Sequence, residues 1–529
     1  MFVQAYSALM SHFRADALEI PKAAGARRAR AESDAFDALR REPGTMLLSE
    51  RLNNPEAYRA LQRERREMLL ALLIAEPNAA IISRIVDLIC LICEESTWSV
   101  NAEGAPFDDE SHPAIDLQCA ETAVLFGWAT RICGERLDAR VITRMRSEAR
   151  RRLFKPILVH DDYAFMRSHG PCPMTIAADI LLSALLLEDD EARLSRLVKP
   201  ALRLLDEACG RHGRANVPLA EAVSDISAVT DLVTLLRDGT GGFVNLSESI
   251  PTGDWLDEIL YPWIQDDLFV DPAGPDMRPQ LSGSDYFRVG SAAKDKPLIC
   301  LASHLHHRIH RPPATVTGRL MELRISDQLE RSSDKPQLLR HGATRNNLVM
   351  TARMPGLYCA LHAGGGRANA GDVCIFADTT QVLTDGGAHH SLPAIAGHGQ
   401  LASPTRPCIA DFEVREDREI MSVELTHAYP ASCGLRSYQR TVLTLRAEHT
   451  VRIMDALDLA QPAPVTFRFV TASKPAVISS AVRFGPVRMT WEGPFTAAAV
   501  PLEGDLTCVE LTASEPVKQA YFAFSFERA

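Results

Sequence analysis

The sequence has no apolar run of the ~18 residues that a membrane-spanning helix needs. The nearest run, Ile81–Cys93, is interrupted by Arg84 and Asp87, so we expect a buried helix there. The N-terminus also lacks the basic segment, apolar core and small-residue cleavage site of a secretory signal. We therefore expect a cytoplasmic protein with no membrane segment.

Several catalytic patterns are missing as well. The sequence contains no Gly-rich phosphate loop, GxSxG nucleophile motif or HExxH metal motif. Its 12 cysteines follow no regular spacing, which favours buried thiols in a reducing compartment. Cys90 and Cys93 form an isolated CxxC inside an apolar helix, where we expect them to pack rather than bind metal.

The charge balance restricts the partners. A formal net charge of -11 argues against nucleic-acid binding, which requires a basic face. It does not exclude a polyanionic sugar, because a local arginine cluster can outweigh the global charge.

The first part of the chain has helical periodicity. Between residues 56 and 95, apolar residues recur at spacings of three and four, with a break at Pro77 and Asn78. Helix after helix of this kind indicates an all-α bundle, solenoid or toroid, and the lack of a short fixed repeat weakens the solenoid. Further helices are expected over 116–134, 141–153, 175–188, 191–209 and 225–237.

The pattern changes near residue 315. Short β-branched or alternating runs follow, separated by Gly, Pro, Asp and Ser, with a hairpin expected around Ala447–His449. Many short strands without helices between them predict an antiparallel sandwich. We divide the chain into an N-terminal helical extension (1–55), a helical domain (56–315) and a sandwich domain (316–529).

Several motifs in order carry a family resemblance. ICEESTWSV (92–100) and IDLQCAETAVLFGWA (115–129) precede FADTTQVLTDGG (376–387), HHSLPAIAGHGQ (389–400) and AYPASCGLRSYQRTV (428–442). Together they resemble the heparinase II/III-like polysaccharide lyases. The resemblance implies a multidomain α+β protein, with an N-terminal (α/α) toroid of helical hairpins followed by an antiparallel β-sandwich.

The resemblance also implies a function. A lyase of this family cleaves uronic-acid-containing glycans by β-elimination, so the expected partner is an acidic poly- or oligosaccharide. Relatives are often periplasmic, which makes the periplasm or cell envelope the alternative location. A homodimer through a broad domain surface is a further expectation.

The catalytic motifs of the family are altered. RSHGPCP (167–173) stands where relatives have an Asn-rich NNWNPW, GRANVPLAEA (213–222) where they have EGPGYW, and GGGRANAGD (364–372) where they have an HNHND-like cluster. The alternative function is therefore an inactive relative that binds glycan or serves as a scaffold. The candidate residues are His169, Arg367 and Asn369 for catalysis and Arg167 and Glu221 for substrate binding.

A metal site is only half supported. Asp385 and His390 match two zinc ligands of some relatives, but a closed tetrahedral site normally needs four. Zinc binding would require another residue, such as His362 or His389, to substitute. The histidine-rich SHLHHRIH (303–310) lacks neighbouring carboxylates, and we interpret it as an exposed helix end.

Overall fold

The computed structural model describes residues 1–22, 25–100, 107, 109, 111–167, 171–212, 217–248, 250, 252–271, 277–333, 335–345, 348–364, 370–384, 389–402, 408–478 and 480–529. The chain forms two compact units. The first contains residues 1–212, 223–251 and 281–336, and the second contains residues 213–222, 252–280 and 337–529.

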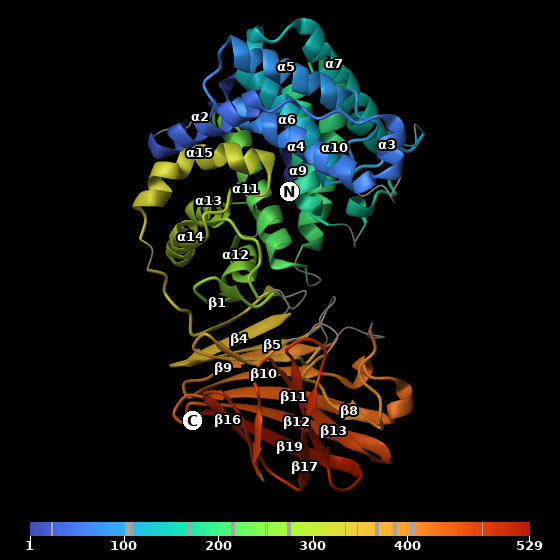
Figure 1. Ribbon diagram of the computed structural model, residues 1–529, viewed down its shortest axis with the longest axis vertical. Helices are drawn as coiled ribbons and strands as arrows, with labels where there is room; N and C mark the ends of the chain where they lie inside the picture. The colour runs from blue at the N-terminus through green and yellow to red at the C-terminus, as the bar shows by residue number, and fades with distance from the viewer. Residues whose placement is uncertain are drawn as a thin grey trace. The chain divides into compact units, whose positions relative to one another are not determined.

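The first unit consists of helices packed on helices, drawn from blue to green and, for the last three, in yellow-green (Figure 1). Their number and short connections agree with the amphipathic stripes in the sequence. The helices are α1 (Tyr6–His12), α2 (Gly25–Arg40), α3 (Leu48–Asn53), α4 (Pro55–Ile74), α5 (Ala79–Cys93), α6 (Leu117–Cys133), α7 (Ala139–Ala149), α8 (Lys155–Val159), α9 (Pro173–Leu187), α10 (Glu191–Arg211), most of α11 (Leu219–Gly239), α13 (Gly283–Ala293), α14 (Lys296–Ile309) and α15 (Val316–Arg331).

Side-chain caps fix where several of these helices begin. Asn54 and Asn78 accept hydrogen bonds from the third residue on, at 3.1 Å and 3.0 Å, and so open α4 and α5. Asp116 does the same for α6, at 3.0 Å from the Cys119 amide. The predicted break at Pro77 and Asn78 is thereby confirmed.

The motif around Glu95 has a packing role. The Glu95 carboxylate is fully buried and pairs with Arg65 at 3.2 Å and Arg66 at 2.8 Å, both from α4. Nearby, the Trp98 indole donates to the Ile92 carbonyl oxygen at 2.9 Å. A buried carboxylate needs partners of this kind, so the segment ties α4 to the end of α5.

The second unit contains helix α12 (Thr252–Leu260), the first turn of α11, a small hairpin and three antiparallel sheets. The sheet orders are β3-β4-β5-β6-β7, β14-β15-β16-β19-β12-β11-β10-β9 and β17-β18-β13-β8. The strands are β1 (Trp263–Gln265), β2 (Leu268–Phe269), β3 (His341–Ala343), β4 (Val349–Met354), β5 (Leu357–His362), β6 (Val373–Ala377), β7 (Thr380–Leu383), β8 (Ala394–Ile395), β9 (Ala410–Val414), β10 (Arg418–Glu424), β11 (Leu435–Leu445), β12 (Thr450–Ala463), β13 (Val465–Thr471), β14 (Ala476–Ile478), β15 (Ala481–Phe484), β16 (Val487–Trp491), β17 (Phe495–Pro501), β18 (Thr507–Ala513) and β19 (Val517–Arg528).

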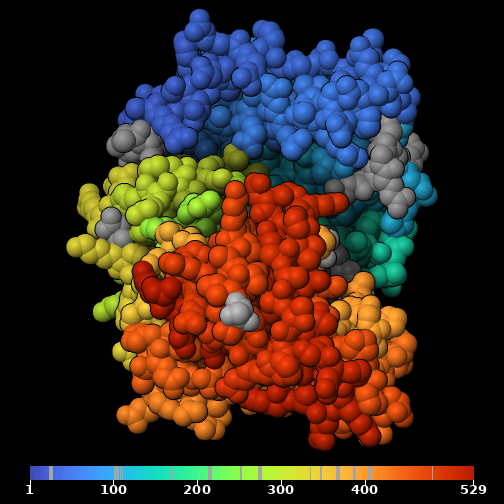
Figure 2. Space-filling view, turned by 60° about the horizontal axis from the view of Figure 1, so that its bottom comes forward, coloured from blue at the N-terminus to red at the C-terminus, as the bar shows by residue number. Residues whose placement is uncertain are grey.

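The three sheets share one hydrophobic core. Alternate residues of β12, such as Val451, Ile453 and Leu457, join it together with Phe467 and Phe524. The predicted hairpin is confirmed, because β11 pairs with β12 from Leu445 opposite Thr450 onward. In Figure 2 the C-terminal strands, drawn in orange and red, form much of the surface of this unit.

The opposite face of the five-stranded sheet is also covered. Tyr358, Ala360 and Phe376 pack there against Ile264 and Leu268 of the β1–β2 hairpin. Residues that precede the sheets by more than 70 positions therefore belong to the same compact unit as the sheets.

The helix-then-sheet order predicted from the sequence is confirmed, whereas the closed toroid and the sandwich remain predictions. The first unit runs to residue 336, because helix α15 follows residue 315, where we expected the change from helices to strands. The three-part division of the chain remains a prediction. All 12 cysteines are free thiols. Among the described residues, no helix is long and apolar enough to span a bilayer.

Candidate functional site

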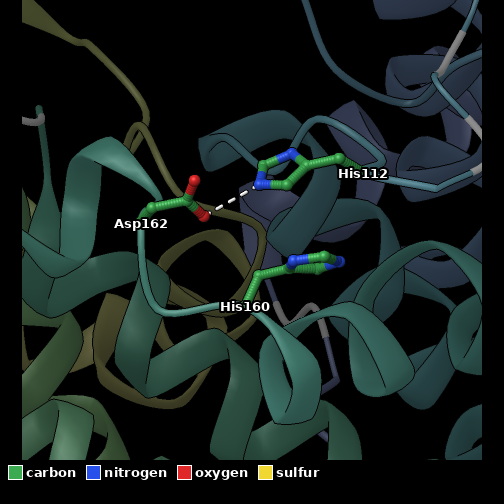
Figure 3. Close-up of side chains that lie close together, drawn as sticks. All are labelled: His112, His160 and Asp162. Carbon is green, nitrogen blue, oxygen red and sulfur yellow. Dashed lines mark hydrogen bonds and ion pairs between the residues drawn. The ribbon is translucent and has the colours of Figure 1, made fainter.

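Two histidines and a carboxylate gather at one place in the first unit (Figure 3). His112 Nε2 donates to Asp162 Oδ1 at 2.8 Å, and the rings of His112 and His160 lie 4.4 Å apart, centre to centre. The three side chains come from two loops, one before α6 and one after α8. The His112 and Asp162 side chains are 38% and 49% exposed, so a large molecule can reach them.

The local sequence holds the His112 loop in place. Asp109 Oδ1 accepts from both the amide and the hydroxyl of Ser111, at 2.8 Å and 2.6 Å. The buried Tyr163 ring lies 4.9 Å from His112, and its hydroxyl donates to the Pro113 carbonyl oxygen at 3.0 Å. Tyr163 therefore supports this site and holds the two loops together.

The electrostatics make His112 more basic and Asp162 more acidic than usual. The hydrogen bond to Asp162 raises the pKa of His112, although burial opposes the shift. The hydrogen bond from His112 lowers the pKa of Asp162, and the positive charge of Arg167 contributes to the same shift. A histidine oriented by a carboxylate can accept and return a proton near neutral pH.

The predicted motif RSHGPCP lies next to this cluster in the chain. Arg167 is exposed and follows the short helical turn Ala164–Met166, where the fold keeps it near Asp162. His169 is outside the described residues, so its catalytic role remains a prediction. Sequence reasoning missed His112, because it lies 50 residues before Asp162 and no local spacing connects the two.

Carboxyl groups are also buried inside the helical unit. Asp179 of α9 is 4% exposed, and its Oδ2 has no hydrogen-bond partner among the residues described. Burial raises its pKa well above the ordinary value, and the charges of Glu121 and Asp225 add to the shift. Asp225 in turn accepts from the Thr175 amide and hydroxyl, at 2.8 Å and 2.6 Å, in the first turn of α9.

The second unit brings together residues of two segments that the sequence singled out. Asp372 ends the segment GGGRANAGD, and His390 lies in the segment HHSLPAIAGHGQ. His390 Nδ1 lies 3.0 Å from Asp372 Oδ2, and the Ser391 amide donates to Asp372 Oδ1 at 3.0 Å. The structure thus assigns His390 a carboxylate partner that the sequence did not suggest. Three predicted residues, Arg367, Asn369 and Asp385, are outside the described residues.

A fully buried arginine fixes both loop ends. Arg440 Nη1 donates to the carbonyl oxygens of Gly371 and Ser391, at 2.9 Å and 2.6 Å. Its Nε and Nη2 donate to the two oxygens of Asp455 at 2.8 Å and 3.0 Å, and the Tyr438 hydroxyl donates to the same carboxylate at 2.7 Å. The motif LRSYQRTV therefore has a structural role: its Arg440 anchors the two loops at Gly371 and Ser391.

Glu221 lies in the first turn of α11, in the part of that helix that belongs to the second unit. The described part of the structure shows no substrate-binding arrangement around it, and its role remains a prediction.

One group of side chains could hold a metal ion. One ligand atom each from His112, His160 and Asp162 lie within 4.8 Å of one another, and two imidazoles with a carboxylate suit a transition metal. The zinc site predicted at Asp385 and His390 remains a prediction, because Asp385 is outside the described residues.

The comparisons with known proteins show a shared fold. The sequence matches no protein-family model and no curated protein. Chondroitin AC lyase from Streptomyces coelicolor A3, solved in complex with chondroitin sulphate, aligns with a TM-score of 0.58 and 11% identity over 99% of this chain and 83% of that chain. Xanthan lyase from Paenibacillus aligns with a TM-score of 0.54 and 9% identity over 94% of this chain and 59% of that chain.

A heparinase III structure gives a TM-score of 0.45, which is too low to establish a common fold. Structural likeness thus shows that this chain shares the fold of the chondroitin AC lyase and the xanthan lyase. The closer resemblance to the heparinase II/III-like family remains a prediction.

Proposed function

We propose that the protein is a polysaccharide lyase that cleaves a uronic-acid-containing glycan by β-elimination. The observation that carries this proposal is the paired His112 and Asp162, with Arg167 close by, in the helical unit of a lyase-like fold. Chondroitin sulphate, bound by the Streptomyces enzyme, is an example of an acidic glycan of the proposed substrate class.

The reaction sets chemical requirements that this group of residues can meet. A base removes the proton on the carbon beside the uronate carboxylate, the bond to the 4-linked oxygen breaks, and a carbon–carbon double bond remains. We assign the base to His112, held in orientation by Asp162. An arginine near the carboxylate can stabilise the charge that develops on it, which is the role assigned to Arg167.

The departing sugar oxygen needs a proton. His160, whose Nε2 lies 3.0 Å from the Ser111 carbonyl oxygen and whose ring faces His112, is the nearest described candidate. Tyr163 is unsuited to this role because it is buried and its hydroxyl is bonded to Pro113. The predicted His169, Arg367 and Asn369 remain further candidates for contacts with the sugar.

The test is absorbance in the ultraviolet band of unsaturated uronates. The panel consists of alginate, heparan, hyaluronan, chondroitin sulphate, xanthan and bacterial exopolysaccharide oligomers. We expect a rise on at least one substrate, and a loss of about 10²–10⁴-fold in rate for His112→Gln, the usual value of a positioned acid–base group. The control is His12→Gln, which changes an exposed histidine of α1 outside the cluster.

Two outcomes would contradict the proposal. A wild-type protein that binds these glycans without any rise would be a glycan-binding relative without the chemistry. A rise that His112→Gln leaves unchanged would place the base elsewhere. A chelator arm tests the metal alternative, because loss of the rise on chelation and recovery with added zinc would make the three side chains ligands instead of acid–base groups.

A further inference from the structure

A second site is suggested by a cavity of about 540 Å³ that lies entirely within the second unit. Its wall includes Arg340, Arg353, Arg446 and His449, and Asp378 is the only carboxylate among the described lining residues. Cationic groups therefore outnumber acidic ones around this space.

Ion pairs do not neutralise this excess. Asp378 is paired outside the wall with Arg528, at 2.6 Å, and Arg446 is paired with the buried Glu419. Within the described part of the chain, Arg340 and Arg353 form no ion pair with a carboxylate. Two positive charges thus remain uncompensated at one cavity.

The structure holds one of these charges firmly in place. Arg353 Nε donates to the Leu339 carbonyl oxygen at 3.1 Å, and Nη2 donates to the Trp263 carbonyl oxygen at 3.1 Å. Its guanidinium lies 4.9 Å from the centre of the Tyr358 ring. Burial lowers the pKa of Arg353, which means that the folded protein bears a cost for the unneutralised charge.

The rest of the cavity completes an anion site. Arg340 is exposed, and its side chain makes no hydrogen bond with any residue that the structure describes. His449 stands in the turn between β11 and β12 with a φ of 50°, and this conformation places an exposed imidazole at the same cavity. A larger cavity in the first unit, of about 910 Å³, differs because carboxylates balance the arginines in its wall. Its charged wall residues are Arg30, Arg41, Arg311, Arg319, Asp34, Asp37, Glu67, Glu322 and Glu330.

We propose that this cavity binds an anionic group of an oligosaccharide, a carboxylate or a sulfate, between Arg340 and Arg353. This site belongs to the second unit, whereas the His112 cluster belongs to the first, and it requires no chemistry of its own. That the anion belongs to a sugar rests on the proposed function; the binding of an anion does not.

The experiment measures binding to the full chain with two anionic probes that a lyase cannot cleave, methyl β-glucuronide and inorganic sulfate. The neutral methyl β-glucoside is the reference, and each compound is titrated by isothermal titration calorimetry at low salt. We expect the glucuronide and sulfate to bind and the glucoside not to bind. Arg340→Gln and Arg353→Gln should each weaken binding about tenfold or more, since hydrogen bonds to charged groups are the strong ones.

The control is Arg488→Gln, which removes an exposed arginine of β16 outside the cavity. If Arg353→Gln fails to fold, Arg340→Gln still tests the site. Its folding should be unaffected, because the Arg340 side chain makes no hydrogen bond or ion pair with the described residues. Unchanged binding in Arg340→Gln, or no binding of either anion to the wild type, would overturn the proposal. Sulfate binding without glucuronide binding would overturn the carboxylate and leave the sulfate as the anionic group. A failed absorbance assay with arginine-dependent binding retained would count against the lyase alone.

Discussion

Replacing Arg440 by methionine should destabilise the second unit more than any surface change. Arg440 and Asp455 are 1% and 0% exposed, and the bidentate pair is joined at 2.8 Å and 3.0 Å. Methionine fills much of the same space but leaves Asp455 with only the Tyr438 hydroxyl as a partner. It also leaves two carbonyl oxygens without their donor. Breaking a buried pair in this way costs about 3–5 kcal/mol.

The assay is hydrogen–deuterium exchange of the β12 amides, which reports on this unit without assuming two-state unfolding of the whole chain. A cost of about 3–5 kcal/mol corresponds to protection lowered by between about a hundredfold and several thousandfold. The control is Arg452→Met in β12, which removes a 3.8 Å ion pair with Glu448, 61% exposed, and a hydrogen bond of 3.1 Å to the Ser525 hydroxyl. That pair should contribute less than about 1 kcal/mol.

The double variant Arg440→Met/Asp455→Leu completes the comparison. Removing both charges should recover much of the lost protection, because no isolated carboxylate then remains buried. If Arg440→Met exchanges no faster than Arg452→Met, the inference that this pair anchors the two loops is refuted.

Two further predictions concern the helical unit. The raised pKa of Asp179 means that the folded protein keeps a proton that the unfolded chain releases, so stability falls as pH rises above the ordinary carboxyl pKa of about 4. Asp179→Asn should therefore raise stability by about 1–3 kcal/mol at pH 8 and by much less at pH 4, and equal effects at the two pH values would contradict a buried protonated acid. Gly283→Ala should lower the free energy of unfolding by about 1–3 kcal/mol, because the new Cβ would stand 2.5 Å from the Ala302 carbonyl oxygen and 2.6 Å from the His306 amide nitrogen. Thermal unfolding measures the change. The control Gly210→Ala should be neutral or stabilising, because no atom lies within 4 Å of its new Cβ.

Much of the fold follows from local patterns in the sequence. Apolar residues at helical spacing placed α4, α5, α9 and α10, and Asn78 marked the break between the first two. Short alternating runs placed the β11–β12 hairpin. These signals are visible because helices and strands are held by contacts of fixed periodicity along the chain.

The candidate site was less visible because its contacts are long-range. His112 and Asp162 meet across 50 residues, and Asp372 and His390 meet across 18. Arg440 reaches Gly371 across 69 residues. No spacing rule connects such pairs, so the sequence singled out the segments around residues 167, 372 and 390 without the residues that contact them.

The membership of the second unit was hidden for a similar reason. The hairpin Trp263–Phe269 lies within the part of the sequence that we expected to be helical. Its apolar side chains nevertheless cover the face of the five-stranded sheet that points away from the shared core. Every position of β5 and β6 is buried. A sheet buried on both faces shows no alternation of apolar and polar residues, so its sequence does not indicate which segment covers the second face.

The most direct test of the proposed reaction is to run it in ¹⁸O-labelled water and weigh the products. Elimination breaks the bond to the 4-linked oxygen without adding water, so the two product masses should sum to that of the substrate, with no ¹⁸O in either fragment and one unsaturated end. Products that together exceed the substrate by one labelled water per cleavage would mean hydrolysis. That result would contradict the assignment of this fold and its His112–Asp162 pair to a lyase.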